Sequence, residues 1–287
     1  MLNVALIGAD SSHTVEYSRR MADPEFDRAQ RVFELNPTRC FAWPTPFQNA
    51  DGIAARMRML AGLGVKAAGS LEEALCGADA VMVEANNPAD HLALIRKTAI
   101  AGLPVFLDKP LADSYANGLA IAGLVRQSGI AFFSSSPLRF AAEVQAMHRR
   151  HPAPRRAEVV GALGKAAAGS DVVWYGVHAF EIAETLMGRG ARCASCTAEG
   201  DSLIFELHWP NDRSGRVELR RNHYAYSGTV DDESFAVNAP NAEFYGETIK
   251  QVEKFFLTGI APVELEDTLE VTRLLDAAAK ASFDKGV

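Results

Sequence analysis

Pro104-Val105-Phe106-Leu107-Asp108-Lys109-Pro110 is an apolar run that ends in a carboxylate, an ammonium and a proline. In a doubly wound sheet, a residue just past the carboxyl end of a strand faces the crevice where ligands bind. A lone Lys-Pro is more often a solvated lysine in a turn, with the proline ending the strand. Polar residues recur at the other strand ends of the first half, and this recurrence favours a Lys109 that faces a ligand.

Outward from this run, the first half of the chain alternates short apolar segments with helical stretches. Strands are predicted at residues 2–8, 39–43, 65–68, 80–83, 105–107 and 130–133. Strands that alternate with helices form a parallel sheet covered on both faces. The sequence therefore predicts an N-terminal doubly wound sheet of Rossmann type.

The second half has a different organisation, which begins after Pro152 and Pro154. Strands are predicted at 158–163, 203–209, 217–221 and 234–237, with helices at 174–187, 242–257 and 267–281. This pattern indicates an α+β domain with a mostly antiparallel open sheet. Because 287 residues exceed the usual domain size of about 100–200, we expect two domains, residues 1–137 and 138–287.

Composition narrows the class of protein. A hydrophobic content of 48% with 23% charged residues is that of a globular protein, and a net charge of -7 opposes nucleic-acid binding. The N-terminus lacks a basic region and its apolar run stops at Gly8, so we expect a cytoplasmic protein without membrane contact. Only Cys193 and Cys196 have a C-x-x-C spacing, and a zinc site needs four ligands, so no metal is expected.

The turn after the first strand departs from a dinucleotide fingerprint. In Gly8-Ala9-Asp10-Ser11-Ser12-His13-Thr14, only Gly8 matches G-x-G-x-x-G. Asp10 replaces the second glycine and His13 the third. A carboxylate beside a diphosphate is repelled by about 1 kcal/mol or more at close range. This turn therefore predicts weaker binding of a dinucleotide.

Two further features bear on the same ligand. The second strand ends in Trp43 and Pro44, without the acid that holds ribose hydroxyls. Ser11 and Ser12 offer hydroxyls beside the free N–H groups of a helix, which can hold a phosphate. Either serine can equally serve only as the helix cap, and the sequence leaves both interpretations open.

Three motifs resemble those of the Gfo/Idh/MocA oxidoreductase family, and the resemblance covers nearly the whole chain. The family's Glu-Lys-Pro appears as Asp108-Lys109-Pro110, and its T-P-N-x-x-H segment as Asn86-Asn87-Pro88-Ala89-Asp90-His91. Its D-x-G-x-H-x-x-D helix appears as Trp174-Tyr175-Gly176-Val177-His178-Ala179-Phe180-Glu181. Trp174 stands where the family has an aspartate and Glu181 is longer than the family's acid, which indicates a divergent branch.

The resemblance implies an N-terminal Rossmann domain for NAD or NADP and a C-terminal domain that shapes the substrate site and often dimerises. It implies that Lys109 binds substrate and tunes the acid/base group, and that His178 exchanges the proton of the substrate hydroxyl. The residues then expected to contact the cofactor are Gly8, Asp10, Ser11, Ser12, His13, Asn86, Asn87, His91 and Asp108.

The chemistry of these side chains supports the same assignment. Oxidation of an alcohol needs a group that takes the hydroxyl proton, and a histidine has an ordinary pKa of ~6.5. His178 and Glu181 are three residues apart on a predicted helix, so Glu181 is expected to hold the imidazole tautomer. The alternative for His178 is a partly buried helix residue hydrogen-bonded to backbone.

The candidates for binding substrate are Arg139, Trp174 and Tyr175. Arg139 follows the last strand of the first half, where it can pair with a substrate carboxylate or with Glu143, four residues on. Trp174 is expected to stack on a sugar or to lie in the core, and Tyr175 to supply a hydroxyl. His13, at a helix N-terminus, can contact the ligand or the backbone.

These features predict an NAD(P)-dependent oxidoreductase that acts on a hydroxyl of a polyol, sugar or related hydroxy acid. The resemblance implies a homodimer formed through the second-domain sheet. Two alternatives stay open: a cofactor-free ligand-binding or regulatory protein, and a non-redox lyase or isomerase that uses Lys109 and His178 on a carbonyl compound.

Overall fold

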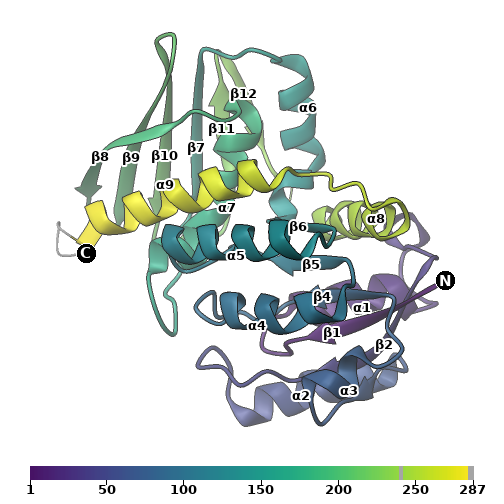
Figure 1. The fold of residues 1–287 in the computed structure, drawn as a ribbon. Coiled ribbons are helices and arrows are strands. Elements are labelled where there is room, and N and C mark those ends of the chain that lie inside the picture. Colours follow the sequence, from purple (N-terminus) through teal and green to yellow (C-terminus); the bar gives the residue numbers. More distant parts are fainter. Residues whose placement is uncertain (239–241, 284–287) are drawn as a thin grey trace.

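Two six-stranded sheets form the framework of the molecule. The computed structural model describes residues 1–238 and 242–283 and shows the first sheet with helices on both faces, beside a second sheet with long helices packed on it (Figure 1). This arrangement confirms the predicted fold class, a Rossmann-type sheet followed by an α+β half.

The first sheet is parallel throughout. Its strands are β1 (Leu2–Ile7), β2 (Leu35–Phe41), β3 (Lys66–Ala67), β4 (Ala80–Val83), β5 (Val105–Asp108) and β6 (Phe132–Ser135), in the order β3-β2-β1-β4-β5-β6. The strand order reverses between β1 and β4, which is where ligands bind in such sheets. Pro37 lies inside β2 at a shift of register between Val4 and Ala5, because proline is tolerated in sheets where a bulge interrupts the ladder.

Helices alternate with these strands. They are α1 (His13–Ala22), α2 (Ala50–Gly62), α3 (Leu71–Leu75), α4 (His91–Thr98), α5 (Tyr115–Ser128) and α6 (Ala142–Arg150), with short 3-10 turns at 28–30, 99–101 and 137–140. Ser70 and Ser114 cap α3 and α5 through their side chains, as serines at helix starts do. No helix in residues 1–238 or 242–283 is both long and apolar enough to cross a membrane.

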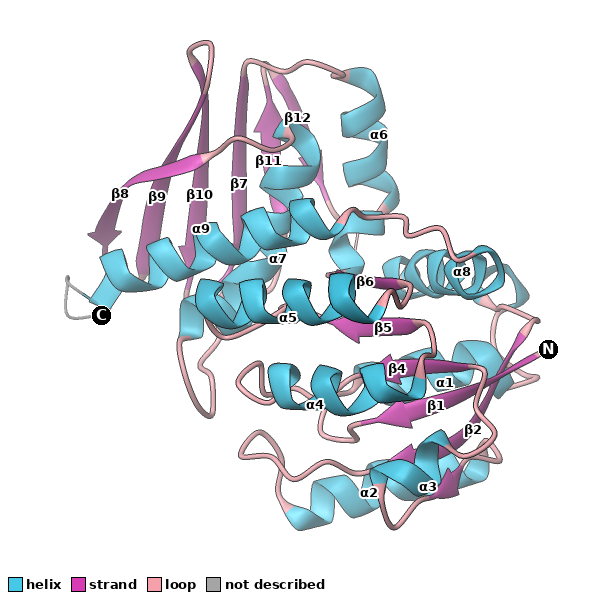
Figure 2. Ribbon diagram, in the orientation of Figure 1, coloured by secondary structure: helices cyan, strands magenta, loops and turns pink. Residues whose placement is uncertain are grey.

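The second sheet is mostly antiparallel (Figure 2). Its strands are β7 (Arg156–Ala162), β8 (Arg192–Glu199), β9 (Ser202–Trp209), β10 (Arg213–Arg220), β11 (Ser227–Val230) and β12 (Glu233–Ala236), in the order β12-β11-β7-β10-β9-β8, with β7 and β10 parallel. The sequence did not predict β8 and β11, which are rich in small and polar residues and lack a clear apolar alternation.

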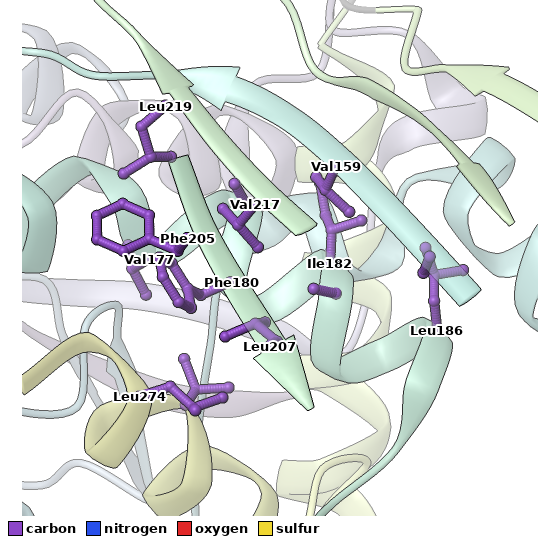
Figure 3. Packing of buried hydrophobic residues seen from close by; sticks show 14 of the residues in the cluster. Val159, Val177, Phe180, Ile182, Leu186, Phe205, Leu207, Val217, Leu219 and Leu274 are labelled. Carbon is purple, nitrogen blue, oxygen red and sulfur yellow. The ribbon is translucent and has the colours of Figure 1, made fainter. Parts of the chain in front are cut away.

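Two helices pack on one face of the second sheet. These are α7 (Asp171–Met187) and α9 (Leu265–Phe283). Figure 3 shows Val177 and Phe180 of α7 against Phe205 and Leu207 of β9, with Leu274 of α9 below them. Because β-strand side chains alternate between faces, this face is apolar while the opposite one carries charge.

The two halves share packing. α8 (Glu243–Thr258) belongs to the second half of the chain, yet Ile249, Val252 and Phe255 pack in the core of the first sheet. The ring centroids of Phe133 and Phe255 are 4.9 Å apart. The boundary at residues 137 and 138 stays a prediction, and the hydrophobic cores do not divide along the chain at that point.

Substitution Phe205→Ala should lower the free energy of unfolding by about 3–5 kcal/mol, because it removes a buried ring and leaves a cavity. Phe205 is 0% exposed and its ring centroid lies 5.4 Å from that of Phe180. Urea denaturation followed by circular dichroism measures the change. Ile260→Ala, at a residue that is 70% exposed, is the control and should change stability by no more than about 0.5 kcal/mol. Equal effects of the two substitutions would contradict this core.

Candidate functional site

A cavity of about 450 Å³ lies between the two halves at the carboxyl ends of β1, β4 and β5. Lys109, just past β5, and His178, in the middle of α7, both line it. The turn after β1 and Asn86 after β4 form its other side. The ammonium and the imidazole that the sequence singled out therefore face one space, although they come from different halves of the chain.

Lys109 is a buried cation at this cavity. It is 7% exposed, and its Nζ makes no hydrogen bond or ion pair with any residue of the described ranges. Its Nζ lies 6.0 Å from the centre of the Trp174 ring. Burial lowers the pKa of Lys109, and Asp108, Asp10 and Glu181 oppose that shift. A buried ammonium without a direct partner is stabilised by a polar or anionic ligand.

His178 is held by a serine. Its Nδ1 lies 2.7 Å from Oγ of Ser136, which follows β6. Burial, followed by the positive charges of Lys109 and His13, lowers the pKa of His178 well below its ordinary value. The imidazole is therefore neutral at pH 7. The expectation that Glu181 holds its tautomer is wrong, because the Glu181 carboxylate turns to other partners.

Those partners include Arg139. Glu181 accepts hydrogen bonds from Ser135 Oγ at 2.7 Å, from the Ser136 N–H at 2.9 Å and from Arg139 Nε at 2.7 Å. The Arg139 Nη2 atom also lies 2.5 Å from a carboxylate oxygen of Glu184. Burial lowers the pKa of Arg139, but the two carboxylates outweigh it and the net shift is upward.

This network corrects both interpretations of Arg139. The guanidinium does not line the cavity of Lys109 and His178, so it is not placed to anchor a substrate carboxylate there. It does not pair with Glu143 either, whose carboxylate accepts the N–H of Asn238. Sequence separation hid the true partners, because Glu181 and Glu184 lie more than 40 residues away on α7.

A larger hollow of about 770 Å³ lies on the other side of this network, where Arg139, Glu184 and Thr185 are part of its wall. It contains none of the residues for which the sequence suggests chemistry except the already paired Arg139. The smaller cavity is therefore the better candidate for a functional site.

The negative charge of Asp10 in the opening turn is accommodated by hydrogen bonds. It is 2% exposed, and both carboxylate oxygens lie 3.0 Å from the peptide nitrogen of Asn86. Burial raises the pKa of Asp10, while hydrogen bonds from Thr45 and the Asn86 N–H oppose the rise. Arg56 donates to the Asp10 carbonyl oxygen at 2.9 Å. The carboxylate thus joins the turns after β1 and β4, and its charge is partly compensated there.

The two serines of the turn have different roles. Ser11 is buried, and its Oγ accepts the His13 N–H at 3.1 Å. Ser12 is exposed and makes no side-chain capping bond to α1. Both line the cavity. The capping interpretation therefore applies to Ser11, and the Ser12 hydroxyl is the one available to a ligand.

His13 pairs with the carboxylate before Lys109. Its Nδ1 lies 2.7 Å from Asp108 Oδ2. Burial would raise the pKa of Asp108, but His13 and then Lys109 outweigh it, so the net shift is downward and Asp108 is ionised at pH 7. The rings of Tyr17 and Tyr245 meet the imidazole edge-on, with centroids 5.9 and 5.0 Å away.

Four residues expected to contact a cofactor do not line the cavity: Gly8, Asn87, His91 and Asp108. Gly8 has φ +105°, and a Cβ there would lie 2.4 Å from the Ala85 nitrogen, so close contact of two backbones requires this glycine. His91 is 0% exposed, and its ring nitrogens lie 2.8 Å from the Pro110 carbonyl and 2.7 Å from that of Ala85. These residues shape the loops around the site.

Aromatic side chains form much of the remaining wall. Trp174 and Tyr175 line the cavity as expected, and Trp174 Nε1 donates to Asn86 Oδ1 at 3.0 Å across it. The residues that the sequence did not single out are Phe47, Gln48, Arg56, Lys165, Tyr224, Tyr226, Phe244 and Tyr245. They come from separate loops and helices and form no motif, so only the fold brings them together.

Comparison with known proteins supports the fold. No protein-family model matches the sequence, and no curated protein does. Among solved structures, a probable dehydrogenase from Thermotoga maritima is similar over 100% of this chain and 98% of its own, with a TM-score of 0.78 and 18% identity. The chain shares the two-domain fold of this protein.

Two more solved structures share this fold. GenD2 from gentamicin A biosynthesis, in complex with NAD, matches over 99% of this chain and 95% of its own, with a TM-score of 0.78 and 14% identity. A myo-inositol dehydrogenase from Corynebacterium glutamicum matches over 99% and 97%, with a TM-score of 0.75 and 14% identity. Likeness at this level of identity establishes the fold, and the chemistry has to be argued from the cavity.

Substitution Arg139→Met should destabilise the folded protein by about 3–5 kcal/mol near neutral pH, because it leaves two buried carboxylates without their cation. Burial already raises the pKa of Glu184, and without the cation this carboxyl would bind a proton still more readily in the folded than in the unfolded state. Stability falls with pH where the folded state binds more protons, so the deficit should grow as pH rises. Urea denaturation at several pH values measures it.

Arg126→Met is the matched control. Arg126 pairs with Glu266 at 2.7 Å, but the two side chains are 55% and 50% exposed. An exposed pair contributes about 0–1 kcal/mol, so the control should show a small loss. A deficit for Arg139→Met that shrinks as pH rises would contradict the assigned network.

Proposed function

We propose that this protein is an NAD(P)-dependent oxidoreductase of the Gfo/Idh/MocA type, which acts on a hydroxyl of a polyol, sugar or related hydroxy acid. One observation carries the proposal: Lys109 and His178, from different halves of the chain, line a single cavity together with the turn that follows β1. A volume of about 450 Å³ suits a small ligand. The sugar and polyol dehydrogenases that share the fold support this substrate class.

The residues around the turn fit a dinucleotide. The Ser12 hydroxyl, the N-terminus of α1 and Asn86 are placed to hold its diphosphate and ribose. Asp10 does not oppose this, because its carboxylate is engaged with the Asn86 N–H. A bound nicotinamide supplies the hydride acceptor for alcohol oxidation. The segment after β2 offers Ala42 and Trp43 and no acid for ribose hydroxyls, so NAD and NADP are both candidates.

The side chains of the cavity then act on the substrate. Lys109 stabilises the negative charge that develops on the substrate oxygen, because a cation in a buried site interacts strongly with an alkoxide. His178 contacts the same oxygen. Trp174 and Tyr175 bind the face and the hydroxyls of a sugar-like substrate, and the other aromatic residues exclude water.

We also propose a cytoplasmic homodimer formed through the second sheet. The face of this sheet that α7 and α9 leave uncovered carries Arg216, Glu218 and Arg220, with Glu218 paired to both arginines. Paired charges on a sheet face can be matched by the same face of a second copy. Analytical ultracentrifugation of the wild type and of Glu218→Arg tests the contact, and a monomeric wild type would contradict it.

A cofactor titration tests the proposed function. NADH or NADPH should raise the melting temperature and change nicotinamide fluorescence, because a ligand at a hundred times its Kd stabilises the folded state by about 2.7 kcal/mol. Absence of both effects at millimolar cofactor would contradict the proposal and favour a cofactor-free binding protein.

Lys109→Met separates binding from chemistry. The substitution keeps the volume of the buried side chain but removes its charge. We expect turnover of the responding compound in a panel of polyols, sugars and hydroxy acids to fall by about 10²-fold or more, and the thermal shift with cofactor to persist. The role of Lys109 would be contradicted if the variant lost the thermal shift with cofactor, while the fraction of protein that still binds cofactor turned over substrate at the wild-type rate.

A further inference from the structure

Two imidazoles, His13 and His178, line the same cavity, and their Nδ1 atoms have chemically opposite partners. A neutral imidazole carries one proton, and the partner of one nitrogen determines whether the other is a donor or an acceptor. The partners of Nδ1 therefore fix what each ring offers to a ligand at Nε2.

For His178, the partner is a hydroxyl with a single proton to give. Ser136 is 0% exposed, and its Oγ already accepts the N–H of Leu138 at 3.2 Å. The acceptor within reach of its O–H, among the described residues, is His178 Nδ1 at 2.7 Å. A buried hydroxyl proton left without an acceptor costs about 1–3 kcal/mol. Ser136 therefore donates to Nδ1, and the proton of the neutral His178 ring resides on Nε2.

For His13, the partner is a carboxylate, which only accepts. Asp108 Oδ2 lies 2.7 Å from His13 Nδ1, and both side chains are at most 10% exposed. The contact lacks the geometry of a hydrogen bond, but a lone pair on Nδ1 would be repelled by a carboxylate oxygen 2.7 Å away, so the proton of the neutral ring resides on Nδ1. The opposite nitrogen, Nε2, makes no hydrogen bond with any residue in the described part of the chain, and the ring lines the cavity. Its lone pair is available to a ligand.

We propose that the His13–Asp108 pair accepts the substrate proton, whereas His178, fixed by Ser136, donates a hydrogen bond to the reacting oxygen. This assignment rests on the proposed oxidation of a hydroxyl. It reverses the role that the family resemblance gives to His178 and assigns a catalytic role to a residue that replaces a fingerprint glycine.

A nicotinamide held at the turn after β1 would be the oxidant, because it would take the hydrogen of the alcohol carbon, with the electron pair of the C–H bond, as hydride. The O–H bond breaks, and its proton forms a bond to His13 Nε2. The resulting imidazolium is stabilised by Asp108, as an aspartate stabilises the histidine of a catalytic triad. Proton release to solvent restores the neutral ring.

A neutral His178 cannot perform this step in its observed arrangement, because its Nε2 already carries a proton. It instead polarises the substrate oxygen without becoming charged, a role known for neutral imidazoles in other active sites. Lys109 adds positive charge around His178, and so does His13 once it has taken the proton, which disfavours an imidazolium at position 178.

Histidine tautomers can be observed directly. We expect long-range proton–nitrogen NMR spectra of the full chain, labelled with ¹⁵N-histidine and recorded at about pH 8, to show that the neutral form of His13 is protonated at Nδ1 and the neutral form of His178 at Nε2. Single substitutions His13→Gln and His178→Gln assign the two signals. A His13 protonated at Nε2, or a His178 protonated at Nδ1, would overturn the proposal whether or not the protein is an oxidoreductase.

Two variants test the partners in the same spectra. Asp108→Asn can donate to Nδ1, so it should shift the His13 proton to Nε2. Ser136→Ala should remove the preference of His178 for one tautomer. His208→Gln, at an exposed residue of β9, is the control and should change neither signal. An unchanged His13 tautomer in Asp108→Asn would contradict the assigned pair, provided that the thermal melt shows a folded protein.

Turnover separates an acceptor from a donor. A glutamine amide can donate a hydrogen bond but cannot accept a proton at neutral pH. His178→Gln should therefore retain at least tenfold more kcat than His178→Leu, whereas His13→Gln and His13→Leu should both lose about 10²–10⁴-fold. The assignment would be overturned if His13→Gln kept much more kcat than His13→Leu, or if His178→Gln kept no more kcat than His178→Leu. If no cofactor binds, the proposed function fails while the tautomers can still be tested.

Discussion

The position of α7 relative to the first sheet depends on one buried cation. Arg139, just after β6, lies between Glu181 and Glu184 on a single turn of α7. An ionised side chain out of water is stable only where its partners are close, so the last strand of the first sheet and the central helix of the second half cannot shift independently. The same carboxylate of Glu181 accepts the Ser136 N–H, which fixes the backbone that carries the Ser136 hydroxyl.

This constraint determines the geometry of the cavity. His178 lies one turn before Glu181 on α7, and its ring reaches Ser136 because the ion network fixes the distance between helix and strand end. On the other side of the cavity, Lys109 follows β5, which pairs with β6 along its length. The ammonium and the imidazole thus approach one another through a strand pairing and an ion network, neither of which involves a ligand. The cavity is formed before substrate binds.

The sequence predicted the first sheet well, because parallel buried strands are continuous apolar runs and their ends carry polar residues. It also placed Lys109 and His178 at one site. It missed β8 and β11, whose small and polar residues pair through backbone hydrogen bonds. It assigned Arg139 a partner four residues away, because local spacing is visible in a sequence, whereas the approach of α7 is not. Ser136 went unrecognised for the same reason.

The opening turn shows that a departure from a motif can be interpreted only when the contacts of the replacing residues are known. Asp10 and His13 occupy positions where a dinucleotide fingerprint has glycine, and alone they indicate a lost function. In the structure each lies against a polar group at the end of another strand. This group is the Asn86 N–H after β4 for Asp10, and the Asp108 carboxylate of β5, 2.7 Å away, for His13. These contacts attach the turn after β1 to the ends of β4 and β5, so both replacing residues are part of the wall of the cavity.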